Sequence, residues 1–158
     1  CPMSRPCATL LLALSLSACG GDDTPISIQV FPAVLAADAR GEAAAWDSVT
    51  FAGSPRGPAG LYRVAPEPLF TEWNIVAARP VSQPDGSAAV AARLNAQAAR
   101  RISQFSAAPA NLKKPLAVKV NDRWADFMPL LSQVNDRLIL YGFTRLEVDQ
   151  LQHHIEHR

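Results

Sequence analysis

Three histidines lie within one short segment, His153, His154 and His157, with Glu156 among them. If this segment is helical, His153 and His157 share one face, and imidazole and carboxylate groups at that spacing can ligate a zinc ion. A zinc site normally needs three or four converging ligands, and the sequence has no other histidine and no cysteine after Cys19. Histidines in a last helical turn also interact favourably with the helix dipole. We therefore expect these histidines to have a structural or incidental role and to bind no metal.

The sequence has no combination of residues that we recognise as a catalytic set. It contains no Gly-x-Ser-x-Gly motif, and its histidines crowd one segment where a buried triad is not expected. The glycine-rich segment 53–60 is interrupted by Pro55 and Pro58 and lacks the Lys-Ser or Lys-Thr ending of a phosphate loop, so we expect a plain connector. We predict a protein that is not an enzyme and that holds no cofactor. The tryptophans expected at the core or its rim are Trp46, Trp73 and Trp124.

Cys19 carries the clearest chemical prediction. An apolar run rich in leucine and alanine, residues 7–16, follows Arg5, and the small residues Ser17 and Ala18 precede the cysteine. An apolar run of about ten residues is too short to span a bilayer but is typical of a secretory signal. Small residues before a cysteine resemble a bacterial lipobox, in which a peptidase approaches the backbone and the cysteine sulfur takes a diacylglyceryl group. We predict cleavage between Ala18 and Cys19 with lipidation of Cys19; ordinary secretory cleavage near Ala18 and an unprocessed anchor are the alternatives.

These features divide the sequence into three predicted segments. Residues 1–18 are a lipoprotein signal peptide, 19–27 are the lipidated cysteine and a tether, and 28–158 are a folded domain. A lipidated cysteine carries more than one acyl chain, which is the condition for stable membrane attachment. We expect a protein of the bacterial cell envelope that is anchored by lipid and faces the periplasm. Gly20, directly after the lipidated cysteine, slightly favours the outer membrane over the inner one.

The composition is that of an ordinary globular domain. Of 158 residues, 49% are hydrophobic and 18% are charged, which is enough for one core without disulfides. Of the 15 lysines and arginines only Arg5 precedes Cys19, and all 14 acidic residues follow it. The part after Cys19 therefore has no net formal charge, which argues against nucleic acid as a partner.

The hydrophobic period changes several times between Ala88 and Gln152. Apolar residues recur at every second position, then about every 3.6 residues, then at every second position and again about every 3.6 residues, which predicts strand, helix, β-meander and helix. The meander begins with the strand 116–120 and ends with the strand 138–141. We predict an α+β fold, in which a small mixed or antiparallel sheet has a β-α-β-β-β-α core and two packed helices.

Local signals define both helices. Asn95 is a suitable N-cap for a helix over residues 96–107. Thr144 and Glu147 form a capping box for the last helix, and Phe143 and Val148 form a hydrophobic staple around it. The apolar stripes expected to be buried are Leu94, Ala98, Ile102 and Phe105 on the first helix and Val148, Leu151 and Ile155 on the last.

Several turns and strands are also predicted. The turn signal Pro84-Asp85-Gly86 allows the strands 75–81 and 87–94 to pair. The tetrapeptide Val-Asn-Asp-Arg occurs at 120–123 and again at 134–137, and we interpret both as turns in which Asn-Asp adopts left-handed backbone. Upstream, the expected elements are a strand at 26–30, a helix at 34–40, a strand at 46–51, a second strand at 61–64, and a helical turn capped by Thr71.

Four stretches resemble one known family. They are Pro66–Ala78, Leu94–Arg101, Asn111–Val120 and Gly142–Glu147. Together they are similar to the head subdomain of the first periplasmic domain in SecD, a subunit of the bacterial protein-export machinery, over roughly residues 61–152. The pattern differs where Lys113 replaces a usual glycine, where Asn121-Asp122 replaces an Asp-Gly turn, and at 126–129, where only the proline is kept.

The resemblance implies a kind of work and a set of partners. SecD has spanning helices and, with SecF, uses the proton gradient, whereas no stretch after Cys19 has the length of a spanning helix. What the resemblance implies is the periplasmic part of that work. We expect a lipoprotein that binds protein or unfolded polypeptide without catalysis, as an accessory to export, with components of the Sec translocon as candidate partners. The alternative is a structural or assembly lipoprotein that docks one folded envelope partner.

Overall fold

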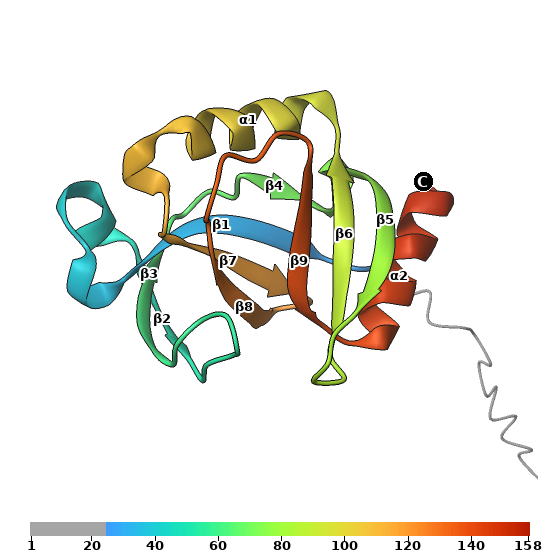
Figure 1. Cartoon of the computed structure of the whole chain (residues 1–158), viewed down its shortest axis with the longest axis horizontal. Helices are drawn as coiled ribbons and strands as arrows, with labels where there is room; N and C mark the ends of the chain where they lie inside the picture. Colours follow the sequence, from blue (N-terminus) through green and yellow to red (C-terminus); the bar gives the residue numbers. More distant parts are fainter. Residues whose placement is uncertain (1–24) are drawn as a thin grey trace, which may run out of the picture.

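Alternating and apolar segments of the chain form strands that assemble into two antiparallel sheets, with two α-helices beside them (Figure 1). The structure is a computed structural model, and it describes residues 25–158. The α-helices are α1 (Ala96–Ala107) and α2 (Arg145–Glu156). The strands are β1 (Ile28–Leu35), β2 (Asp47–Phe51), β3 (Gly60–Val64), β4 (Phe70–Thr71), β5 (Ile75–Ser82), β6 (Ala88–Leu94), β7 (Pro115–Val120), β8 (Arg123–Pro129) and β9 (Arg137–Phe143).

The two sheets differ in size and connection. The larger sheet has the order β2-β3-β1-β7-β8, with β4 also paired to β1, and the smaller sheet has the order β5-β6-β9. The predicted α+β fold and the element order β-α-β-β-β-α, from β6 to α2, are confirmed. None of the helices in residues 25–158 is long and apolar enough to cross a membrane.

The predicted meander is wrong at its last strand. β7 pairs with β8, but β9 pairs with β6 in the other sheet. The connection after β8 is held away from β8 by α1, because the buried Ser106 hydroxyl accepts a 2.8 Å hydrogen bond from the backbone N–H of Val134. Alternation in β9 shows that one of its faces is buried, but it does not show which strand lies beside it.

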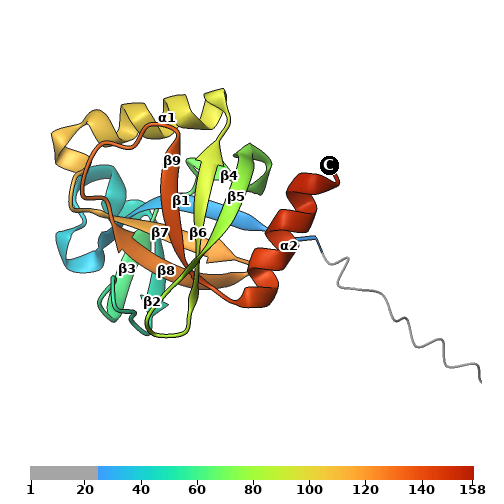
Figure 2. The same ribbon diagram turned by 45° about the vertical axis from the view of Figure 1, so that its right-hand side comes forward.

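The main core fills the space between the inner faces of the two sheets and the two helices. Val90 of β6, Leu140 of β9, Ile102 of α1 and Leu151 of α2 are fully buried in it. Figure 2 shows α2 beside β5, at the side of the smaller sheet. The predicted stripes on both helices are confirmed, with Phe105 and Ile155 partly buried at their ends.

A second core lies on the opposite face of the larger sheet, where β2 and β3 fold over it. Its centre is aromatic: the rings of Tyr62 and Phe127 have centroids 4.1 Å apart, and Phe51 lies 4.9 Å from Phe127. β1 is therefore buried on both faces, because two consecutive residues of this strand, Val30 and Phe31, belong to different cores.

The helix predicted over residues 34–40 is wrong. β1 continues to Leu35, and Val34 and Leu35 pair with Arg63 and Tyr62 of β3. Only 3₁₀ turns follow, at Ala36–Asp38 and Gly41–Ala45. Alanine-rich sequence favours a helix, but burial of Val34 and pairing with β3 outweigh that weak local preference.

Most of the local signals are confirmed. Asn95 caps α1 by accepting a 3.0 Å hydrogen bond from the N–H of Ala98, and the Thr144–Glu147 capping box is present. β5 and β6 pair across the predicted turn. The first Asn-Asp turn is left-handed, with φ of 48° at Asn121 and 67° at Asp122. The left-handed turn predicted at the second Asn-Asp pair is wrong, because residues 135 and 136 do not have positive φ.

Candidate functional site

The residues predicted for signal cleavage and lipidation lie outside the described part of the chain. Ala18 and Cys19 precede residue 25, where the description begins. Signal cleavage and lipidation therefore stay predictions. Among the first described residues, Ile26 is only 3% exposed and belongs to the main core, whereas Pro25 and Ser27 are exposed.

The three histidines lie on the last turns of α2 and at its end. The rings of His153 and His157 stack with centroids 4.0 Å apart, whereas the ring of His154 meets the edge of Trp73 at 4.6 Å. In residues 25–158 no three His, Cys, Asp or Glu side chains gather as metal ligands would.

His154 lies in a different environment from the other two histidines. Its Nε2 atom is buried without a hydrogen-bond partner among the described residues. Burial, followed by the positive charge of Arg158, lowers the pKa of His154, and the nearby Glu72 opposes that change. The neutral ring is therefore favoured, which suits packing against an aromatic side chain.

Of the three tryptophans, Trp124 lies at the rim of a core as predicted, whereas Trp46 and Trp73 belong to neither core. Trp124 is partly buried beside the second core, 5.8 Å from the ring of Phe31, and the ammonium of Lys119 lies 5.3 Å from its ring. Trp73 is 62% exposed. Trp73 borders a small cavity of about 240 Å³ together with His154 and Arg158, and its ring packs against His154. Trp124 packs against the second core.

The glycine-rich segment 53–60 does more than connect β2 to β3. It supplies the partners of Asp126, a fully buried carboxylate in β8. Ser54 Oγ donates a 2.5 Å hydrogen bond to Asp126 Oδ1, and Arg56 Nε donates a 2.7 Å hydrogen bond to Oδ2. The backbone N–H of Phe127 donates to Oδ1 at 2.8 Å. We call Ser54, Arg56 and Asp126 the aspartate cluster.

The aspartate cluster fixes the segment against β8. Ser54 Oγ also accepts from the N–H of Gly57 at 2.9 Å, and a Cβ on Gly57 would overlap the carbonyl oxygen of Phe127. Burial and then the charge of Asp126 raise the pKa of Tyr62, whose hydroxyl donates to the Pro58 carbonyl at 2.7 Å. Asp126 is fully buried and both of its carboxylate oxygens accept hydrogen bonds, so the chemistry of the cluster is that of a structural anchor.

Sequence reasoning missed the aspartate cluster, although one signal was present. Asp126 stands between Ala125 and Phe127 in a run, residues 124–129, that is otherwise apolar, and a charge at such a place needs a partner. The spacing does not identify that partner, because Ser54 and Arg56 lie 72 and 70 residues away in the sequence.

An apolar groove lies between the ends of β8 and β9, and we call it the inter-sheet groove. Its volume is about 370 Å³. Leu131, 74% exposed, and Ile139, 39% exposed, leave large apolar surfaces at its mouth. The guanidinium of Arg56 also borders it, 4.1 Å from the ring centroid of Tyr141. The other residues that line it are Leu116, Met128, Pro129, Leu130, Ser132, Val134 and Leu138.

β9 forms one side of this groove and has a free backbone edge. Among the described strands it pairs only with β6. At its far end β9 touches β8, because Arg123 donates to the Gly142 carbonyl at 2.8 Å and Gly142 lies against Ala125. Away from that contact the two edges separate and leave the inter-sheet groove. A free edge beside an apolar groove can accept an extended chain through backbone hydrogen bonds and side-chain burial.

Comparisons with known proteins relate this fold to SecDF. A solved structure described as "Structure and function of a membrane component SecDF that enhances protein export" matches with a TM-score of 0.53 and 13% identity, over 80% of this chain and 60% of that chain. SecDF in its Super-membrane-facing form matches with a TM-score of 0.51 and 14% identity, over 79% of this chain and 18% of that chain.

Comparison by sequence alone gives no such relative. No protein-family model matches the sequence, and no curated protein matches it. The chain spans less than two thirds of either SecDF chain, and at these identities the likeness concerns the fold alone. The chain has a SecD-like fold, and the resemblance found in its sequence is confirmed at that level.

Proposed function

We propose that this protein is an envelope lipoprotein whose SecD-like domain binds extended polypeptide without catalysis, as an accessory to protein export. The observation that carries the proposal is the free edge of β9 beside the inter-sheet groove. Its substrate is an unfolded segment with apolar side chains, which adds a strand to β9 and buries those side chains in the groove.

The groove has the properties that such a substrate needs. Backbone pairing along a strand edge gives affinity that depends little on sequence, as a protein that meets many unfolded chains requires. Leu131 and Ile139 present apolar surface that is in contact with water, and covering it stabilises the complex. Nothing in the groove is placed to cleave a chain, because its polar members are Arg56, Ser132 and Tyr141.

The comparison with SecDF supports the link to export. One of the matched structures is described as a membrane component that enhances protein export. A lipid at Cys19 would hold the domain at a membrane, and Ile26 ties the start of the described chain to the main core. Localisation at a periplasmic membrane surface and a role in export are both parts of this proposal.

Binding is tested with a labelled peptide of alternating valine and serine, followed by fluorescence anisotropy. Leu131→Ser should weaken binding at least about tenfold, because a leucine side chain buried against the peptide contributes about 1.5–3 kcal/mol. Leu146→Ser is the matched control, since Leu146 is 51% exposed on α2, away from the groove. The same peptide with alternate backbone nitrogens methylated should not bind, because it cannot pair with β9.

Two results would contradict the proposal. Equal affinity of the Leu131→Ser and wild-type proteins would remove the groove as the binding site. Indifference to every unfolded peptide, together with recovery of one folded partner in fixed stoichiometry, would favour the assembly lipoprotein instead.

The anchor is tested separately. Cells given radioactive palmitate should label the wild-type protein, and Cys19→Ser should abolish both the label and the sedimentation of the protein with membranes. Persistence of the label in Cys19→Ser would place the lipid elsewhere.

A further inference from the structure

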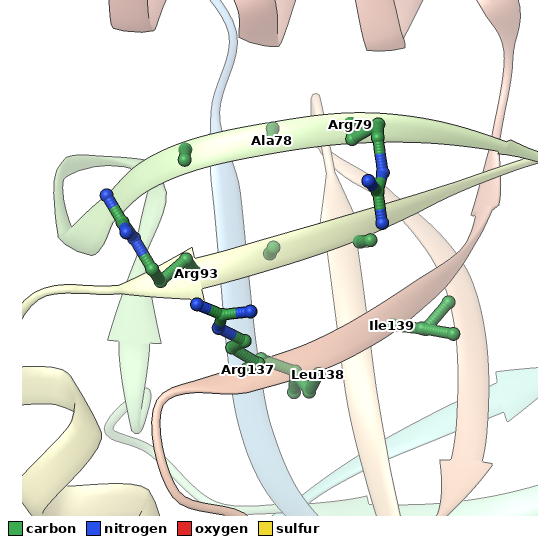
Figure 3. Close-up of a pocket in the computed structure, with 9 residues that line it drawn as sticks. Ala78, Arg79, Arg93, Arg137, Leu138 and Ile139 are labelled. Carbon is green, nitrogen blue, oxygen red and sulfur yellow. The ribbon is translucent and has the colours of Figure 1, made fainter.

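The outer face of the smaller sheet carries a hollow with a floor of alanines and walls of arginines. Its volume is about 450 Å³, within the range of about 300–1,000 Å³ that is common for ligand pockets. Figure 3 shows Arg79 extending from β5 toward β6, Arg93 from β6 toward β5, and Arg137 from β9 toward β6. We call it the arginine hollow. The other residues that line it are Ala77, Ala78, Ala91, Ala92, Leu138 and Ile139.

Strand register places the arginines around the alanines. Arg93 stands opposite Arg137 on one side and opposite Ala77 on the other. Ala91 stands opposite Arg79 in β5 and Ile139 in β9. Like charges that stand directly opposite each other on neighbouring strands destabilise a sheet. The pairing of Arg93 with Arg137 therefore does not stabilise the isolated fold.

These arginines have no acidic partner within the described part of the chain. The two ion pairs in residues 25–158 join Arg56 to Asp126 and Arg123 to Glu147. No aspartate or glutamate lines the arginine hollow. Three guanidinium groups therefore present donors around one small cavity, and guanidinium matches carboxylate in charge and in geometry.

We propose that the arginine hollow binds an acidic segment of a partner protein. Its carboxylates pair with Arg79, Arg93 and Arg137, while its backbone lies over Ala77 and Ala91. The alanine floor lies below the guanidinium groups, so a protruding chain can fill the hollow, whereas a flat bilayer surface would not reach the floor. This contact goes beyond the binding of apolar polypeptide, because it uses charge and lies on the outer face of the sheet.

The probe is a fluorescein-labelled peptide of alternating glutamate and serine, with a glutamine-for-glutamate peptide as its neutral control. The double substitution Arg93→Gln with Arg137→Gln should raise the dissociation constant about tenfold, because each charge-assisted pair is lost. Arg100→Gln with Lys114→Gln is the charge-matched control at two exposed sites outside the hollow. The neutral peptide should bind none of the proteins, and added salt should weaken binding to the wild type.

A second variant tests the shape of the hollow without a change of charge. Ala91→Leu raises the floor and should also weaken binding of the glutamate peptide. Equal weakening by the two charge-reducing variants would overturn the proposal in favour of net charge alone. Vesicles of anionic phosphatidylglycerol that bind through Arg93 and Arg137, with no binding of the peptide, would assign the surface to a membrane instead.

The two proposed sites are distinguishable in the same assays. Leu131→Ser should weaken only the valine-serine peptide, and the Arg93→Gln, Arg137→Gln variant should weaken only the glutamate-serine peptide. Loss of either peptide alone leaves the other proposal standing.

Discussion

The aspartate cluster and the arginine hollow are two groups of charged side chains that the fold treats in opposite ways. In the cluster, both carboxylate oxygens of the buried Asp126 accept hydrogen bonds, and Arg56 neutralises its charge. In the hollow, three arginines stand on an open face, and no acidic residue lines it. A buried charge loses its hydration and is tolerated only with partners, whereas a surface guanidinium keeps its water. The aspartate cluster therefore stabilises the fold, and the arginine hollow is available to bind another molecule.

Removal of the buried charge should have the largest effect. Asp126→Ala should lower the free energy of unfolding by about 3–4 kcal/mol, because it leaves a mostly buried guanidinium without its partner. The side chain of Arg56 is only 20% exposed. Urea unfolding followed by tryptophan fluorescence measures the change.

Asp149→Ala is the control, because Asp149 is an exposed carboxylate on α2 and its loss should change stability by at most about 0.5 kcal/mol. Arg56→Ala added to Asp126→Ala should cost much less than the sum of the single changes. A loss below about 1 kcal/mol for Asp126→Ala would refute the structural role of the cluster.

Substitution at the junction of β8 and β9, next to the aspartate cluster, should cause the next largest loss of stability. Gly142 has φ of 86°, and a Cβ there would overlap the carbonyl oxygen of Ala125. Gly142→Ala should cost about 2–3 kcal/mol, from left-handed strain together with that overlap.

Gly86 offers a matched comparison, since its φ is 81° and a Cβ there meets nothing within 4 Å. Gly86→Ala should therefore cost only the strain, about 1 kcal/mol. If the two variants lose the same stability, the contact between β8 and β9 does not restrict this position.

The same contrast separates what sequence could predict from what it could not. Caps such as Asn95 act on the N–H three residues ahead, so the sequence contains both partners side by side. Asp126 is a charge in an apolar strand, but its partners lie on a segment some seventy positions upstream. Local chemistry shows that a partner is required, and only the tertiary fold selects it.

The repeated Val-Asn-Asp-Arg tetrapeptide shows this limit with identical residues. At 120–123 the two strands β7 and β8 pair directly, and the Asn-Asp pair takes the left-handed backbone that a tight hairpin needs. At 134–137 the backbone of Val134 is bound by Ser106 of α1, and the chain crosses to the other sheet. The position of β9, and with it both proposed binding surfaces, depends on that distant contact.

The arginine hollow should respond to substitution in the opposite sense from the aspartate cluster. Arg93→Gln with Arg137→Gln removes a like-charge pair and should leave stability unchanged or raise it by up to about 0.5 kcal/mol. Urea unfolding at low salt measures the effect, which added salt should reduce. A loss of more than about 1 kcal/mol would show that the arginines serve the fold and are not reserved for a partner.

His154 is intermediate in burial between the aspartate cluster and the arginine hollow. Its substitution should have the smallest effect on stability. It is partly buried, and burial, then the charge of Arg158, lowers its pKa from the ordinary value of 6.5. The unfolded chain therefore takes up a proton at higher pH than the folded chain does. Its contribution to stability is complete above pH 6.5 and is lost as the pH falls through that value toward the lowered pKa. His154→Gln should remove this part of the pH dependence, which unfolding free energies measured on both sides of that window will show. If the two proteins lose stability in parallel as the pH falls, the proton is taken up elsewhere, and contact with Trp73 does not hold the ring neutral.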